Sequence, residues 1–204
     1  LPVFYVFEHF SASRRQTVIL WLIWTLILNL VGYHWIMHTI AVYGMMPTFV
    51  AFPLFLLYSL GTGGKMLLFF FFLRWMYRRA DIFTSAAKCT LAAAAAFGLC
   101  ELVGWQLFPW HGANIVSGDL LFAQGADLIG TRGMSAVWVA MQFLLYQAGG
   151  DFQRDKQKSF IKLATQSRNA QVFLLIAVAT HLYGYIQYSR FESFEAAAPK
   201  FVVG

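Results

Sequence analysis

The sequence predicts an all-α protein, a polytopic transmembrane helix bundle with about five full spans and a partial one at the N-terminus. Apolar residues make up 59% of the 204 residues and charged residues only 12%, which is about half the charged share of a soluble domain. Five apolar segments are long enough to cross a bilayer, which takes about 20 residues. The Lys and Arg residues gather in short clusters between these segments, as membrane topology requires.

The predicted segments are residues 1–10, 16–43, 47–79, 82–105, 128–148 and 169–189. Residues 1–10 are too short to span a bilayer and are interpreted as the end of a helix that starts before Leu1. Pro53 and the glycines within 61–64 interrupt the third segment. No charged loop separates its halves, which favours one long kinked helix over two half-spans. The alanine run 92–96 favours close approach of another helix.

Basic residues occupy every second connection. Residues 11–15, 74–88 and 149–168 carry Lys and Arg, whereas 44–46 and 106–126 carry none. Because basic loops stay in the cytoplasm, loop 106–126 and the C-terminus are predicted to face the opposite side of the membrane. The net charge of +6 is therefore explained by topology and predicts no nucleic-acid partner.

Four charged residues lie in or beside the spans, where insertion of a charge costs about 2.5–3.5 kcal/mol. Lys65 is predicted to extend into a polar gap, or to contact a lipid phosphate or a carboxylate. Glu101 is predicted to bond a neighbouring helix. Asp127 precedes a helix and is placed to cap it. Arg132 is interpreted as a partner of Asp127 or Glu101, or as a ligand of an anionic lipid headgroup.

Catalytic and metal-binding signatures are missing from the sequence. His34 and His38 have the spacing of metal ligands, but no third ligand accompanies them, so they are interpreted as interfacial residues. His181 is interpreted as a core or interface residue, and Cys89 and Cys100 as small core residues. We therefore expect no metal, no cofactor and no catalytic residue in this chain.

Loop 106–126 is the most irregular part of the sequence. It holds three glycines, one proline and several large apolar side chains. An apolar loop at a membrane surface either enters the lipid or covers an apolar surface. Phe108, Trp110 and Phe122 are the side chains predicted to do so.

Four motifs follow one another in a fixed order. They are Gly32–Ile36 with Tyr43–Pro47; Glu101 with Phe108-Pro109-Trp110, Gly112 and Gln124; Ala126–Gly130 with Gly133–Ser135; and Tyr183–Tyr185 with Ala198–Gly204. Together they resemble the membrane portion of bacterial apolipoprotein N-acyltransferase. Three features depart from that pattern. Leu102, Val103 and Gly104 stand where the family often has an Arg after the glutamate, and Arg132 stands where it commonly has a non-basic residue. The sequence also stops at Gly204, where a nitrilase-like domain would be expected to begin.

The resemblance implies a function in lipoprotein biosynthesis. Members of the family move an acyl chain from a phospholipid to the N-terminal cysteine amine of a diacylated lipoprotein, through a thioester on a catalytic cysteine. Residues 1–195 would form the transmembrane domain, and 196–204 would open a nitrilase-like domain that carries the Glu–Lys–Cys catalytic set. No catalytic residue of the family therefore maps onto this chain.

The resemblance also implies a place and a site. The chain would be a multi-pass protein of the bacterial inner membrane, with loop 106–126 and the C-terminus in the periplasm. Its partners would be phospholipid and the diacylated lipoprotein. The expected substrate-binding residues are Glu101, Phe108, Pro109, Trp110 and Arg132. The alternative is a non-enzymatic scaffold or lipid-binding subunit of a larger membrane complex, a reading that the missing Arg after Glu101 favours.

Overall fold

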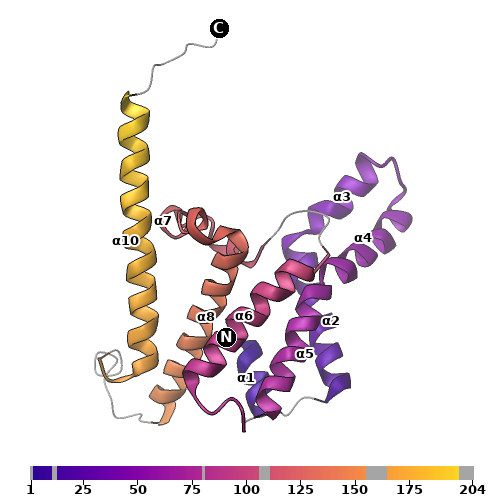
Figure 1. Ribbon diagram of the computed structural model, residues 1–204. Helices are drawn as coiled ribbons and strands as arrows, with labels where there is room; N and C mark the ends of the chain where they lie inside the picture. The colour runs from indigo at the N-terminus through magenta and orange to yellow at the C-terminus, as the bar shows by residue number, and fades with distance from the viewer. Residues whose placement is uncertain (1, 11–12, 80, 106–110, 155–164, 198–204) are drawn as a thin grey trace. The chain divides into compact units, whose positions relative to one another are not determined.

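The computed structural model describes residues 2–10, 13–79, 81–105, 111–154 and 165–197 (Figure 1). Within these ranges every regular element is a helix, which confirms the predicted all-α class. Four of the described helices are long and apolar enough to cross a membrane, and a bent pair raises the number to five. The chain divides into two compact units, Leu1–Trp110 and His111–Gly204, and each is described by itself.

Within the described residues of the first unit there are six helices, two of which begin at a capping serine. They are α1 (Pro2–His9), α2 (Arg14–Gly32), α3 (His34–Val42), α4 (Thr48–Thr62), α5 (Gly64–Arg78) and α6 (Ala86–Val103). A reciprocal pair of bonds starts α2: the Ser13 hydroxyl accepts the Gln16 amide and the Gln16 side chain accepts the Ser13 amide. This capping box satisfies two amides that helix geometry leaves without partners. Ser85 caps α6 through the Lys88 amide.

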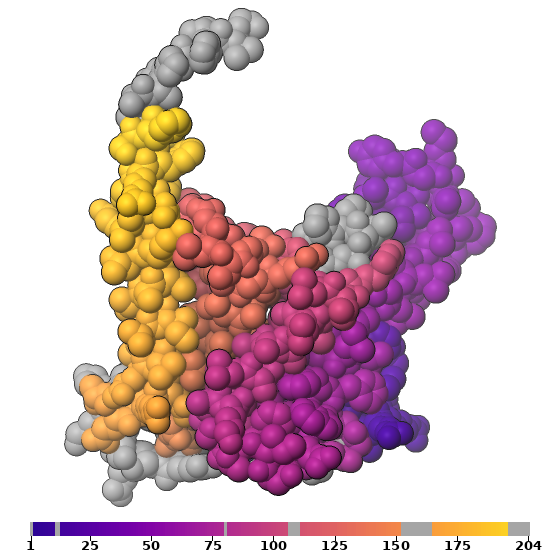
Figure 2. All heavy atoms as spheres, viewed as in Figure 1, coloured from indigo at the N-terminus to yellow at the C-terminus, as the bar shows by residue number. Residues whose placement is uncertain are grey.

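The segment predicted at 16–43 is two helices rather than one. The backbone leaves helical geometry at Tyr33, which separates α2 from α3. Figure 2 shows the ends of α3 and α4 projecting together from the rest of the first unit. The turn between them and the start of α4 carry strongly exposed apolar side chains, Tyr43, Met45 and Phe49 among them. Residues 34–64 contain no Lys, Arg, Asp or Glu, so this arm suits an apolar environment.

The interruption predicted within 47–79 lies at Gly63, where α4 and α5 are bent by 42°. The segment is two helices with a break at Gly63, and it is either one broken span or a re-entrant pair. Both alternatives of the sequence analysis, one kinked helix and two half-spans, therefore stay open. Pro53 lies inside α4 without ending it. At the bend, the indole Nε1 of Trp21 donates to the Gly63 carbonyl oxygen at 2.7 Å. The same carbonyl oxygen also accepts the Met66 and Leu67 amides of α5, so the α2 side chain adds a further bond where α5 begins.

Gly63 and Gly64 offer a matched test of this bend. A Cβ on Gly63 would lie 2.6 Å from the Thr25 Cγ2 atom, whereas a Cβ on Gly64 would meet nothing within 4 Å. We expect Gly63→Ala to lower the free energy of unfolding by about 1–3 kcal/mol, because α2 must move away. Gly64→Ala is expected to change it by less than about 1 kcal/mol. Denaturation in detergent micelles measures both, and equal effects would contradict the packing at Gly63.

Small and aromatic residues pack α5 against α6. Ala93 is fully buried and Ala96 nearly so, so the alanine run lets the helices approach closely, as its composition indicates. The rings of Phe69 and Phe97 meet edge to face with centroids 5.1 Å apart. On the other side of α5, Phe7 of α1 meets Phe70 in the same geometry at 5.5 Å.

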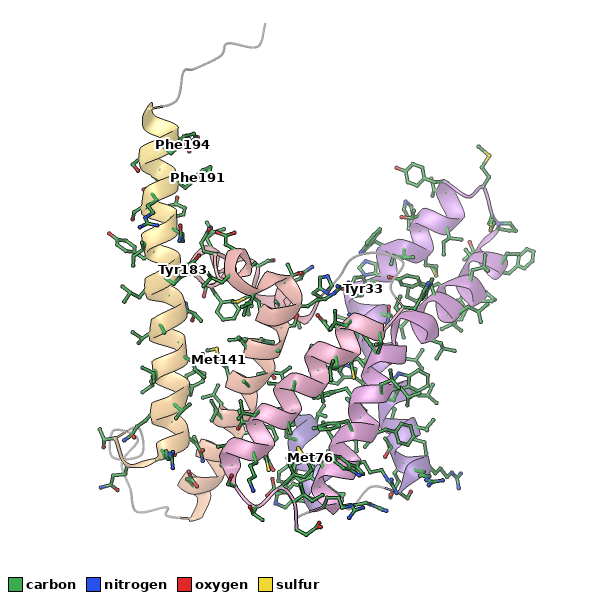
Figure 3. All side chains as sticks on the ribbon, viewed as in Figure 1. Tyr33, Met76, Met141, Tyr183, Phe191 and Phe194 are labelled. Atoms are coloured by element: carbon green, nitrogen blue, oxygen red, sulfur yellow. The ribbon has the colours of Figure 1, made fainter. Side chains whose placement is uncertain are left out.

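The described residues of the second unit form two long helices and two short ones. They are the 3₁₀ helix η1 (Gly112–Val116), α7 (Leu120–Ala123), α8 (Ala126–Arg154) and α10 (Arg168–Ala197). Gly130 interrupts α8 near its start with φ 69° and ψ 170°, a conformation that glycine adopts readily. Phe122, Met134 and Met141 form the buried core, and Figure 3 shows Met141 between α8 and α10.

Candidate functional site

A buried ion pair joins α5 to α6 in the first unit. The Lys65 Nζ atom lies 3.4 Å from the Glu101 Oε1 atom, and the two side chains are 7% and 0% exposed. The structure therefore selects one of the interpretations of Lys65, the carboxylate partner. It also gives Glu101 the predicted bond to a neighbouring helix. Because each charge would be costly alone in this environment, the pair holds these helices in one register.

Glycines lie near this pair, so the neighbouring backbone and side chains approach each other closely. A Cβ on Gly104 would lie 2.6 Å from the Lys65 Cβ atom, and one on Gly61 would lie 3.0 Å from the Trp105 ring. Gly104 ends α6, and its amide donates to the Cys100 carbonyl oxygen at 2.9 Å. The pair thus fixes the end of α6, from which the chain leads into loop 106–126.

Residues 111–125, here called the loop segment, are ordered by contacts with α8 and α10 in the second unit. The Ala113 amide donates to the Ser135 hydroxyl at 2.9 Å, and that hydroxyl donates to the Thr131 carbonyl oxygen at 3.0 Å. Phe122 is 4% exposed and lies in the core with Met134 and Met141. Of the two roles predicted for this side chain, it covers an apolar surface rather than entering lipid.

The loop segment meets α10 through Asp119 and Gly184. The Asp119 Oδ2 atom lies 2.8 Å from the His181 Nε2 atom, and the Asp119 Oδ1 atom accepts the Phe122 amide at 3.1 Å. Bonds from Phe122 and then from His181 hold the pKa of Asp119 below its ordinary value, so this carboxylate stays ionised at neutral pH. Gly184 allows α7 to approach closely, and Tyr183 lies at the same level (Figure 3).

The other predicted site residues have different positions. Phe108, Pro109 and Trp110 lie outside the described residues. Asp127 lies inside the first turn of α8 rather than before the helix, and Arg132 is exposed near the same end. Within the described part of the chain, no ion pair joins Arg132 to Asp127. The structure therefore brings Glu101 to Lys65 and leaves Arg132 at the surface of its own unit.

The sequence analysis did not identify Asp119 or Ser135 as functional candidates, and it did not predict the pairing of His181 with Asp119. The sequence contains a signal for Asp119, because an acidic residue directly before a short apolar run is typical of a helix N-cap. A lone histidine in an apolar span also calls for a polar partner. His34 and His38 are both exposed, and the described residues form no group of His, Cys, Asp and Glu that could hold a metal ion.

Long apolar helices, a buried charge pair between two of them and an ordered apolar loop segment define a multi-pass helical membrane protein. Residues 1–144 match the model of the apolipoprotein N-acyltransferase N-terminal domain. Because that match covers more than half of the sequence, the chain belongs to this family. The resemblance is thereby confirmed over residues 1–144, which include the first three of the four motifs.

Two curated relatives illustrate the similarity. Apolipoprotein N-acyltransferase 1 of Leptospira interrogans (serovar Lai, strain 56601) is 33% identical over 147 residues, which are 69% of this chain and 25% of the relative. Apolipoprotein N-acyltransferase 2 of Leptospira interrogans (serovar copenhageni, strain Fiocruz L1-130) is 29% identical over 144 residues, 66% of this chain and 23% of the relative. The aligned region is thus about a quarter of the length of these relatives. No solved structure matches the chain.

Proposed function

We propose that this chain is the membrane domain of an apolipoprotein N-acyltransferase and holds the two lipid substrates during acyl transfer. The observation that carries the proposal is the family match over residues 1–144, which includes the first unit, the loop segment and much of α8. The substrates would be a phospholipid and a diacylated lipoprotein whose N-terminal cysteine amine receives the acyl chain. The chemistry would belong to a C-terminal domain that opens at 196–204, after a membrane domain formed by 1–195.

The distribution of basic residues gives the orientation in the membrane that this proposal uses. With basic connections in the cytoplasm of a bacterial cell, loop 106–126 and the C-terminus would face the periplasm across the inner membrane. Phe108, Pro109 and Trp110 would line the lipid entrance, with Glu101 at its root. Arg132 is exposed, and its guanidinium would bind an anionic headgroup, since the planar donors match phosphate oxygens.

The alternative role as a non-enzymatic subunit drew its support from the missing Arg after Glu101. Lys65 provides Glu101 with a cationic partner from α5 instead of from the same helix. The carboxylate is therefore neutralised in this chain even though its neighbours Leu102, Val103 and Gly104 are uncharged. That departure from the family pattern no longer favours a scaffold over an enzyme domain.

Replacing Trp110 tests the lipid-entrance role. In the full-length protein in phospholipid vesicles, we expect Trp110→Ala to lower kcat/KM for acylation of a diacylated lipopeptide about tenfold, because a large aromatic anchor is lost. Trp110→Phe, the matched control, is expected to keep most of the rate. Equal rates for wild type and Trp110→Ala would remove Trp110 from the site, and a full-length protein without any transfer would overturn the proposed function.

A further inference from the structure

The His181 ring lies between two hydrogen-bond acceptors. The His181 Nδ1 atom lies 2.7 Å from the Ala177 carbonyl oxygen, and the Nε2 atom lies 2.8 Å from the Asp119 carboxylate. A carbonyl oxygen and an ionised carboxylate are acceptors only, so a ring nitrogen that bonds either of them must donate. A neutral imidazole has one donor and can serve one of these acceptors, whereas an imidazolium can serve both.

The carboxylate in this pair has a second task. While one oxygen accepts from His181, the other accepts the Phe122 amide and caps α7. Asp119 therefore ties the first turn of α7 directly to α10. Among the described residues, Asp119 is the charged group placed against His181. The neighbouring Phe122 ring, with its centroid 6.4 Å from that of the imidazole, is neutral.

The pair is a polar contact between the loop segment and α10, which otherwise meet through apolar, closely packed groups. Gly184, one turn after His181, lies against the backbone of Leu121. Near the start of the loop segment, the Ala113 amide donates to the Ser135 hydroxyl of α8. Both side chains of the pair are 41% exposed at the surface of the second unit, so the packing of the chain does not close the pair off from protons.

We propose that His181 and Asp119 are positioning residues, which latch the loop segment onto α10 as an imidazolium–carboxylate pair. The latch rests on the proposed function, because the loop segment is part of the loop to which lipid holding is assigned. It is closed while Asp119 is ionised and His181 is protonated. Raising the pH through the titration of His181 removes one donor and one charge, and the loop segment then separates more often from α10.

Hydrogen exchange of the α7 amides tests the latch in the chain itself, held in detergent micelles. For wild type, we expect the protection factors of residues 120–125 to fall about fivefold between about pH 5.5 and about pH 8.5, since the ordinary pKa of histidine lies between them. Asp119→Asn retains a capping side chain but removes the carboxylate charge. We expect it to lower protection at the acidic pH and to abolish the dependence on pH.

A second variant keeps the test independent of misfolding. The exchanged pair Asp119→His with His181→Asp restores opposite charges at the same positions, and we expect it to recover part of the protection and of the pH dependence. Wild-type protection that is equal at both pH values, or an Asp119→Asn variant that behaves as wild type, would overturn the latch.

Acyl transfer by the full-length protein separates the latch from the proposed function. We expect wild-type transfer to decline on the alkaline side of the pH profile more steeply than transfer by Asp119→Asn. Identical profiles would overturn the positioning role, even if hydrogen exchange shows the pair. The proposed function would still stand in that case, because the rate of wild type and the effect of Trp110→Ala test it separately.

Discussion

Replacing Lys65 by methionine is expected to lower the free energy of unfolding by about 3–5 kcal/mol, because it leaves the Glu101 carboxylate buried without its cation. The two side chains are 7% and 0% exposed, so water cannot take over from the lost partner. The double variant Lys65→Met with Glu101→Leu removes both charges. We expect it to recover most of the loss, since a buried pair replaced by apolar residues is often neutral in stability.

The measurement is reversible unfolding in mixed micelles for wild type, both single variants and the double variant. Lys88→Met is the matched control, because this lysine is also bonded to a neighbouring side chain, that of Thr84, but is exposed. We expect the control to change stability by less than about 0.5 kcal/mol. If the losses of the two single variants simply add in the double variant, Lys65 and Glu101 do not act as a pair.

Local composition predicts where the helices lie and offers candidate positions for a break, but it does not choose among those positions. The alanine-rich span, predicted at 82–105, is found as Ala86–Val103, because a long apolar run bounded by polar residues needs no further information. The bend at Gly63 cannot be placed from composition alone. It depends on Trp21 and Thr25 of α2, which are about 40 positions away in the sequence. Pro53, the stronger local signal, leaves α4 intact.

The candidate site shows the same limit. The cost of charge in an apolar span singles out Lys65 and Glu101 one at a time, yet their pairing depends on how α5 and α6 pack. Asp119 and His181 are separated by 62 positions, and no periodic pattern connects them. Sequence therefore identifies residues that need a partner, whereas the packing of the helices decides which partner each receives.

Gly184 is the second position where a single substitution is expected to have a large effect. A Cβ added there would lie 1.9 Å from the Leu121 carbonyl oxygen and 2.6 Å from the Leu121 carbonyl carbon. Backbone atoms cannot move aside as a flexible side chain can, so Gly184→Ala is incompatible with α7 docked on α10. We expect the loss of docking to cost about 1–3 kcal/mol or more.

Limited proteolysis with chymotrypsin in detergent micelles measures this docking directly. Phe122 is 4% exposed in the docked loop segment and becomes a cleavage site when α7 leaves α10, so we expect Gly184→Ala to be cut after Phe122 at least about fivefold faster than wild type. Gly149→Ala in α8 is the matched control, because a Cβ there meets nothing within 4 Å and alanine favours a helix. Equal cleavage of wild type and Gly184→Ala would show that α7 does not depend on the close approach at Gly184. Faster cleavage of Gly184→Ala alone would make the glycine of the Tyr183–Tyr185 motif a packing requirement of the loop segment.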